Sequence, residues 1–350
     1  MKSMRALAAV ARAAAVAAVT VHPVFNLNIA VMGNSRLVAT LTNEGLEPVV
    51  VLNADGLLSE YPVQKVHITS EETGENIPFQ GLRGYIDRDL LTATDFTTIL
   101  PRQSEEVVFD VAETFDLTEG GRYMIQSRLN IDYAVNGDIT NIGTHAIESN
   151  TLLTEIDGQQ ASYSLHSFRS THQKRANINS NCSGAQRSAV EASVKHTHSM
   201  AIEASKAAKS GPAKKMEEYF KRTDDNTRNI VAGVFDKMAR VYSGGGKPNL
   251  HCRDIHNYCG RGWVAYCVFS PSDIVFCNTW FQRFKELDKG CRKVDQAFIA
   301  LHEATHLNEV KNTDDYGVYG YDGLRRLSAD KNINHADTYS YFAHDVLAGC

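Results

Sequence analysis

The chain has 350 residues, enough for two domains that each bury a core of their own. Hydrophobic residues make up 43% and charged residues 22%, which is ordinary for a globular protein and argues against a disordered or fibrous chain. Over the whole chain acidic residues outnumber basic ones and the net charge is −5, so no nucleic-acid partner is expected.

The first residues predict export. Residues 1–12 carry three basic residues and no acid, and residues 13–21 form a short apolar run. This pattern is typical of a signal peptide over residues 1–21 and is too short for a membrane helix. A mitochondrial presequence is the alternative, because Arg12 interrupts an alanine-rich segment without acids. No later segment approaches the roughly 20 apolar residues of a membrane span, so we expect a secreted, extracellular protein without stable membrane association.

Residues 26–156 have the pattern of strands. Short segments such as RLVATLTN, EPVVVLN and KVHITSE alternate apolar and polar residues, and Asn-Gly, Asp-Gly and Gly-Gly turn signals separate them. Strands at this spacing predict an all-β, sandwich-like domain. The region contains no cysteine.

Residues 157–181 are polar and almost without aliphatic side chains, which predicts an exposed linker open to proteolysis. Lys174 and Arg175 form a dibasic pair of the kind that processing endoproteases recognise. A cut after Arg175 would separate a part with 13 basic and 21 acidic residues (−8) from a part with 23 and 20 (+3). We expect these oppositely charged parts to dock.

The pattern becomes helical after Cys182. Apolar residues recur three and four apart, and Asp224 and Asp225 are candidate N-caps. A hairpin is predicted over residues 263–281. The helices expected from the periodicity span residues 185–210, 213–222, 224–242, 291–310 and 332–349.

All the cysteines lie in this second part, which is typical of a secreted domain held by disulfides. Seven is an odd number, so the simplest expectation is three bridges and one unpaired thiol. The cysteines are Cys182, Cys252, Cys259, Cys267, Cys277, Cys291 and Cys350.

The sequence His302-Glu303-Ala304-Thr305-His306 has the spacing of a metal site. Residues four apart share one face of a helix, so His302 and His306 can bind one ion, with Glu303 beside them as a general base. The alternative is a chance occurrence of the five residues on a structural helix.

The sequence narrows the choice of a third ligand. A third histidine at the H-x-x-G-x-x-H spacing is absent, because Glu309 and Asn312 occupy those positions, and no glutamate follows Glu309. On a continuous helix Glu309 itself would lie about 10 Å along the axis from His302, too far to share an ion. The candidates that remain are Asp314 and Asp315 in the following turn.

At these residues the chain resembles the deuterolysins, secreted fungal zinc endopeptidases of the aspzincin group. Their signature is H-E-x-x-H followed by G-T-x-D-x-x-Y-G. Thr313 and Asp315 match, so the resemblance implies Asp315 as the third zinc ligand. Asn312 stands where the family has glycine. Tyr319, implied to hydrogen-bond the transition state, follows one residue late unless Val318 takes the tyrosine position.

The resemblance also implies a domain organisation. Residues 1–21 would be the signal peptide, residues 22–175 a β-rich propeptide that ends at the dibasic site, and residues 176–350 the catalytic domain. That domain is expected to be a mainly α, zincin-like metalloprotease with a small β-hairpin and three disulfides. The implied pairs leave Cys267 free and are Cys182–Cys252, Cys259–Cys277 and Cys291–Cys350.

Several polar residues have less specific expectations. Asp337 matches an aspartate of the family that lies near the site, where it would support a ligand or set specificity. Asp314 is expected in a turn, and His335 and His344 are expected to be structural. Histidines expected at the surface or in loops are His196, His198, His251 and His256.

The function implied is hydrolysis of proteins and peptides by water activated on one Zn²⁺ per chain, with Glu303 as general base. The enzyme would be a monomer made as a zymogen, and its relatives imply a preference for basic proteins. The propeptide, which has no cysteine to bind zinc, would inhibit sterically. One alternative is a catalytically inactive, secreted zinc-binding interaction protein. The other is a disulfide-held structural domain without metal.

Overall fold

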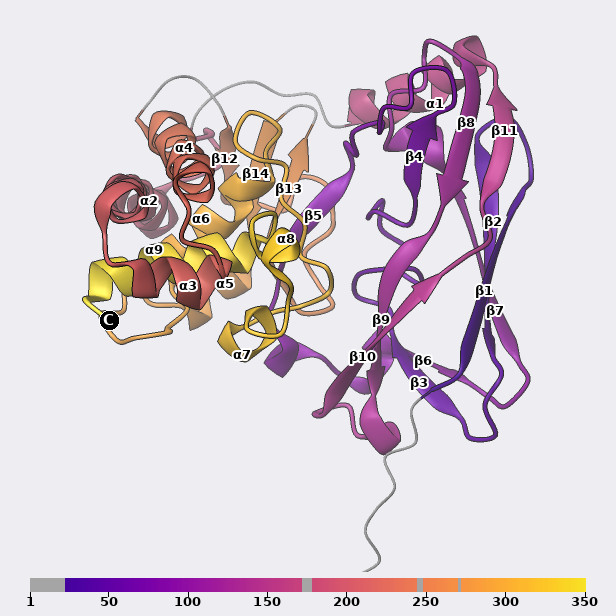
Figure 1. Ribbon diagram of the computed structural model, residues 1–350, viewed down its shortest axis with the longest axis horizontal. Coiled ribbons are helices and arrows are strands. Elements are labelled where there is room, and N and C mark those ends of the chain that lie inside the picture. Colours follow the sequence, from indigo (N-terminus) through magenta and orange to yellow (C-terminus); the bar gives the residue numbers. More distant parts are fainter. Residues whose placement is uncertain (1–22, 172–177, 244–247, 270–271) are drawn as a thin grey trace, which may run out of the picture.

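The computed structural model describes residues 23–171, 178–243, 248–269 and 272–350. A β-rich region (residues 23–171) and a mainly helical region (residues 178–350) lie side by side (Figure 1). The expected signal peptide and the Lys174-Arg175 pair lie outside the described residues. In the described part of the chain, no helix combines the length and apolar character needed to cross a membrane.

The β-rich region contains three antiparallel sheets, with the strand orders β1-β2-β7, β10-β9-β3-β6 and β11-β8-β4. Strand β2 shows the predicted alternation, because Leu37, Ala39 and Leu41 are buried while the residues between them are more exposed. The β-rich character expected from the sequence is therefore confirmed. The strands are β1 (Phe25–Val31), β2 (Arg36–Asn43), β3 (Val49–Leu52), β4 (His67–Ser70), β6 (Phe96–Ile99), β7 (Ser104–Asp110), β8 (Gly121–Gln126), β9 (Arg128–Ala134), β10 (Ile142–Glu148) and β11 (Leu152–Ile156).

The expected linker after this region is wrong in its first half, which forms helix α1 (Gly158–Thr171). Asp157 accepts the backbone N–H groups of Gln159 and Gln160 and so begins the helix. Ala161 and Leu165, one turn apart, are buried in the β-rich region. These two apolar residues at helical spacing, with a hydrogen bond from the Ser164 hydroxyl to Asp110 at 2.8 Å, dock the helix although the segment is polar overall.

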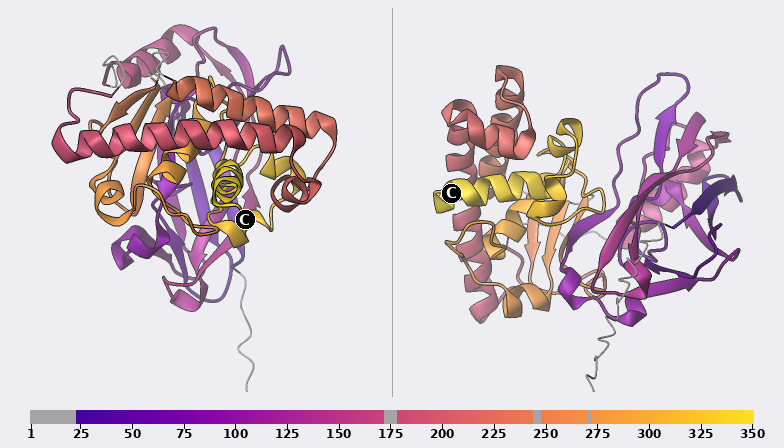
Figure 2. Two further views of the ribbon diagram at one scale, coloured as in Figure 1. Left: turned by 90° about the vertical axis from the view of Figure 1, so that its left-hand side faces the viewer. Right: turned by 60° about the horizontal axis from the view of Figure 1, so that its bottom comes forward.

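The helical region is built around one buried helix, α6 (Gln296–His306). It contacts α2, α4, α9 and the strands β13 and β5, while the long helices α2 and α4 pack against each other on the outer side (Figure 2). The other helices are α2 (Gly184–Ser210), α3 (Ala213–Phe220), α4 (Asp225–Tyr242), α5 (Asn278–Arg283), α7 (Tyr321–Leu324), α8 (Ala329–Asn332) and α9 (Ala336–Ala348).

One sheet joins the two regions. Its order is β12-β14-β13-β5, where β12 (Asn249–His251), β13 (Trp263–Phe269) and β14 (Ser272–Phe276) belong to the helical region. The antiparallel β13–β14 pair confirms the predicted hairpin as far as Phe276, but residues 278–281 of that prediction belong to helix α5 instead. The turn residues Ser270 and Pro271 lie outside the described residues. The fourth strand, β5 (Leu82–Ile86), comes from the β-rich region and was not expected here.

Three disulfides hold the helical region, and they join the pairs that the resemblance implied. They are Cys182–Cys252, Cys259–Cys277 and Cys291–Cys350, while Cys267 is buried and unpaired.

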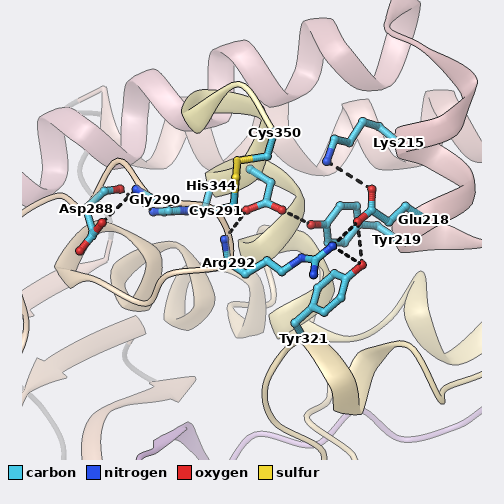
Figure 3. Close-up of a disulfide and its surroundings, with 11 residues drawn as sticks. Lys215, Glu218, Tyr219, Asp288, Gly290, Cys291, Arg292, Tyr321, His344 and Cys350 are labelled. Atoms are coloured by element: carbon cyan, nitrogen blue, oxygen red, sulfur yellow. Dashed lines mark hydrogen bonds and ion pairs between the residues drawn. A yellow bond between two sulfur atoms is a disulfide. The ribbon is translucent and has the colours of Figure 1, made fainter.

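The third bridge, Cys291–Cys350, ties the last residue of the chain to the loop before α6 (Figure 3). Beside it the Arg292 guanidinium lies 3.8 Å from the centroid of the Tyr321 ring, and the Tyr321 hydroxyl donates to Glu218 at 2.7 Å. These contacts connect α3 to α7, the short helix that follows the predicted metal-binding loop.

Candidate metal centre

Helix α6 carries the H-E-x-x-H motif through the interior of the helical region. All its residues are buried, which explains why its sequence is apolar on every face except at the motif. The helix begins where the Asp295 side chain accepts the Phe298 N–H at 2.7 Å. It ends at His306, earlier than expected, so His302 and His306 lie on its last two turns.

Three side chains converge beyond these two turns. The Nε2 atoms of His302 and His306 lie 3.1 Å apart, and each is 3.3 Å from a carboxylate oxygen of Asp315. All three residues are buried, and their ligand atoms lie within 4.8 Å of one another. Among the described residues, this is the one group of histidine, cysteine and acidic side chains that meets the spacing of a metal site.

The protonation of the two histidines makes this arrangement fit a cation. His302 Nδ1 lies 2.9 Å from the carboxylate of Asp337, and His306 Nδ1 lies 2.9 Å from the carbonyl oxygen of Thr313. Each Nδ1 must carry a proton to donate to these acceptors, so in the neutral imidazole each Nε2 presents a lone pair. The two Nε2 lone pairs and the Asp315 carboxylate thus face one another. These electron-rich groups repel one another unless a divalent cation binds between them.

Asp337 and Thr313 therefore fix the orientation of the two imidazoles. Asp337 is fully buried, and its second oxygen accepts the Gly320 N–H at 2.7 Å. Burial raises the pKa of Asp337, but the hydrogen bond from His302, together with other contributions that include the hydrogen bond from Gly320, outweighs burial and holds the pKa below its ordinary value. A carboxylate behind a ligating histidine is a common support for a metal ligand.

The loop between residues 312 and 315 brings Asp315 to the histidines. Asn312 has a φ of 55°, a left-handed conformation that glycine and asparagine adopt most readily, which explains how Asn312 can replace the family's glycine. The Thr313 hydroxyl lies 2.6 Å from that of Thr305 on α6. Asp314 accepts the Tyr316 N–H at 2.7 Å and is a turn residue, as expected.

Glu303 lies beside the three converging residues and is fully buried. Its Oε1 accepts the backbone N–H of Tyr85, on β5, at 2.9 Å, and its Oε2 receives no hydrogen bond from any described residue. Burial, followed by the charge of Asp315, raises the pKa of Glu303 well above its usual value. Burial likewise raises the pKa of Asp315 to about 7 and lowers that of His306 to about 3.

Tyr319 lies against the β-rich region near Glu303, with its hydroxyl toward Asp55 and Gly84. Its hydroxyl donates to Asp55 at 2.9 Å and lies 3.5 Å from the carbonyl oxygen of Gly84, and its ring is 5.9 Å from that of Tyr85. The Val318 side chain instead lies against Gly323 of the following helix α7.

Other expected residues lie away from this centre. The Glu309 carboxylate accepts the Ser272 hydroxyl at 3.3 Å, and because α6 ends before it, the continuous helix assumed in excluding Glu309 as a ligand is wrong. His251 and His256 were expected at the surface or in loops. His256 does lie in a loop, whereas for His251 the expectation is wrong, because it is buried on β12. Their side chains are 1% and 3% exposed and flank the buried carboxylate of Asp273.

Sequence reasoning missed the residues that the β-rich region contributes near this centre. Asp55, Gly84 and Tyr85 all contact Tyr319 or Glu303, although they precede the motif by more than two hundred positions. No pattern in a single sequence relates two such distant segments, because the contact depends on how the two regions pack.

Comparison with known proteins identifies the family. A model of the deuterolysin metalloprotease (M35) family matches residues 2–350, and the chain belongs to this family. The chain is 37% identical over 328 residues to a neutral protease 2 homologue of Colletotrichum graminicola, covering 93% of this chain and 92% of the relative. It is 34% identical over 348 residues to a neutral protease 2 homologue of Pyricularia oryzae, covering 98% and 97%. The protein is therefore a zinc metalloendopeptidase.

A zinc peptidase from Grifola frondosa is similar among solved structures. It has a TM-score of 0.40 and 18% sequence identity, and the match covers 47% of this chain and 97% of that one.

Proposed function

We propose that the protein is a secreted zinc endopeptidase made as a zymogen, with residues 22–175 as the propeptide and residues 176–350 as the catalytic domain. The observation that carries this proposal is the convergence of His302, His306 and Asp315 beside the buried Glu303. The position of β5, from the proposed propeptide, against the same glutamate supports the zymogen.

His302, His306 and Asp315 would hold the zinc ion. When bound, zinc supplies a Lewis acid that makes water a nucleophile near neutral pH and polarises the scissile carbonyl. Glu303 takes the proton of the attacking water and delivers it to the leaving amine. Tyr319 donates a hydrogen bond to the carbonyl oxygen as negative charge develops on it.

We assign Asp337 a positioning role rather than a role in specificity. Both of its oxygens accept hydrogen bonds, from His302 and from Gly320, and the residue is fully buried. A carboxylate in that state is not available to a basic substrate side chain. The preference for basic proteins therefore stays a prediction from the family resemblance, to be tested with a peptide library of varied charge.

The experiment for the proposed function compares Glu303→Gln with the wild-type chain after processing near Arg175. Glutamine is close to glutamate in size but cannot take a proton, so casein hydrolysis should fall several hundred-fold while zinc is retained, within the roughly 10²–10⁴-fold of general-base catalysis. In the unprocessed chain glutamine can still accept the Tyr85 N–H, so folding of the zymogen should not change. Glu309→Gln is the matched control, since that carboxylate contacts Ser272 instead.

The same experiment separates the two alternatives. A processed wild-type protein that binds zinc without cutting casein or a peptide library would be the inactive interaction protein. A protein that binds no zinc would be the structural domain, and either result would contradict the proposed function.

A further inference from the structure

Strand β5 belongs to the β-rich region by sequence but to the helical region by pairing. It runs antiparallel to β13 from the pair Leu82–Val268 to the pair Ile86–Trp263. Within the described residues, β5 pairs with no strand of its own region, and its one β-bridge to that region joins Leu82 to Val63, which lies outside the named strands. Figure 1 shows β5 lying at the boundary between the two regions. Because β13 has β14 on its other side, β5 covers an edge of the helical region's sheet.

The peptide group between Gly84 and Tyr85 on β5 contacts both Glu303, to which we assign proton transfer, and Tyr319, to which we assign binding of the carbonyl oxygen. The Tyr85 N–H donates to Glu303 Oε1 at 2.9 Å, and the Gly84 carbonyl oxygen lies 3.5 Å from the Tyr319 hydroxyl. The Tyr85 ring packs edge-on against the ring of His302, with 5.2 Å between centroids. The amide and the carbonyl thus point to the groups that would serve the leaving amine and the carbonyl oxygen of a substrate.

We propose that β5 is the inhibitory segment of the zymogen. It docks on the edge of β13 in place of an extended substrate, with the Gly84–Tyr85 peptide group where the scissile peptide would lie. This inference rests on the proposed function, and it identifies the edge of β13 as the docking site and residues 82–86 as its occupant.

The contacts of Tyr319 explain why the Gly84–Tyr85 bond would stay intact. A tyrosine hydroxyl has one hydrogen to donate. In the structure this hydrogen goes to Asp55 at 2.9 Å rather than to the Gly84 carbonyl at 3.5 Å. Because Asp55 also comes from the β-rich region, the same region presents the substrate-like peptide and diverts the donor that would activate it.

Arginines on both sides of the docked peptide hold the loop that carries Asp315. The Arg83 guanidinium donates to the carbonyl oxygen of Thr313 and, at 3.0 Å, to Asn312 Oδ1. Arg88 donates to the carbonyl oxygen of Gly317 at 3.0 Å. Both arginines come from the β-rich region although that region is acidic overall, so local hydrogen bonds rather than net charge fix the docking at the site.

The docked region is not packed tightly everywhere. A cavity of about 550 Å³ lies beside β5, lined by Gln64 and Asn130 of the β-rich region and by Asp314 and Tyr316 of the helical region. Because the interface is open at this cavity, the β5–β13 pairing and the arginine contacts are the interactions that hold the inhibitor in place. An inhibitor held by few interactions can dissociate after processing.

Gly84 is the residue through which docking can be tested. A Cβ at this position would lie 2.4 Å from the Ala265 carbonyl oxygen and 2.6 Å from the Tyr266 Cα, both atoms of the β13 backbone. Backbone atoms cannot rotate away as a side chain could, so alanine at position 84 must push β5 off β13. At Gly33, in contrast, a Cβ would meet only the Arg36 Cβ at 3.8 Å, so Gly33→Ala is the matched control.

The experiment measures hydrolysis of a quenched fluorescent peptide by the full chain before and after cleavage by a dibasic-specific endoprotease. Unprocessed Gly84→Ala should be about tenfold or more as active as unprocessed wild type, a typical effect of overpacking on a docking equilibrium. Unprocessed Gly33→Ala should match wild type, and all processed forms should be equally active. Tyr85→Pro, which lacks the N–H that Glu303 accepts, should act in the same direction if the alanine variant misfolds.

Hydrogen exchange by mass spectrometry provides a readout that does not depend on activity. The amides of residues 82–86 should be protected in wild type and exchange rapidly in Gly84→Ala. An alanine variant that loses this protection but stays as latent as wild type would overturn the proposal, as would unprotected amides in wild type or cleavage of the Gly84–Tyr85 bond by the protein itself. If processed protein is inactive while the exchange pattern holds, the proposed function fails and the docking stands.

Discussion

Replacing Asp337 with asparagine should weaken metal binding without changing the shape of the site. Asparagine has one acceptor oxygen and one donor group where aspartate has two acceptors. If its oxygen accepts the Gly320 N–H, its NH₂ faces His302 Nδ1, which must lose its proton, and the proton moves to Nε2. That atom, 3.3 Å from Asp315, would then have no lone pair for an ion. If the amide is turned round, two donors meet at Gly320.

Either orientation has a cost that can be estimated. A buried donor left without an acceptor costs about 1–3 kcal/mol. Loss of a carboxylate behind a ligating histidine weakens metal affinity by about 10- to 100-fold, which corresponds to about 1.4–2.7 kcal/mol. The assay is equilibrium dialysis of the full chain against a graded chelator near neutral pH, with zinc counted by mass spectrometry.

Asp330→Asn is the control, because the Asp330 side chain is 81% exposed and pairs with Arg222 at the surface. It should bind zinc as the wild type does. If Asp337→Asn also bound zinc with wild-type affinity, Asp337 would not orient His302 in the way we infer. Thermal unfolding of both variants in chelator should show whether a loss of zinc affinity reflects the site or the fold.

Two further predictions concern groups away from the metal ligands. Burial lowers the pKa of His344, but the hydrogen bond to Asp295 at 3.1 Å and the Asp345 carboxylate 3.9 Å away outweigh it and raise the pKa from 6.5 to about 9. Because the folded pKa is the higher one, this stabilisation, at most about 3 kcal/mol, is complete below pH 6.5 and lost as the pH rises through about 9. Urea unfolding across this range should show the loss, and Asp295→Asn, which keeps the helix cap, should flatten it; an unchanged slope would contradict the pairing. For Cys267, burial raises the thiol pKa well above its usual value, so a thiol reagent should modify it only on unfolding, and rapid labelling of the native chain would refute this.

Local patterns were sufficient to predict much of the fold. Alternation in β2 and helical spacing in α2 and α4 were readable because each element buries one face against its own region. Helix α1 was missed because its two buried residues, Ala161 and Leu165, stand among polar ones. The periodicity also predicted that the motif helix continues to residue 310, whereas it ends at His306. Leu307 and Val310 beyond that end are buried and so keep the apolar spacing, but they are not helical.

Those residues of the candidate site that are close to one another in the sequence could be predicted. His302, Glu303 and His306 followed from helix geometry, whereas the choice of Asp315 over Asp314 came from the family signature. In the structure the loop turns Asp315 toward the histidines and Asp314 toward its own backbone. The contact between Tyr85 and Glu303 could not be predicted, because it depends on the packing of two regions distant in sequence.

The zinc stoichiometry of full-length protein, compared between Asp315→Asn and Asp314→Asn, tests the metal centre most directly. Wild type and Asp314→Asn should each retain a single ion per chain after dialysis, and Asp315→Asn should lose it, since the converging group contains Asp315 alone of the two. Full zinc content in Asp315→Asn, or its loss in Asp314→Asn, would contradict the assignment of the ligands.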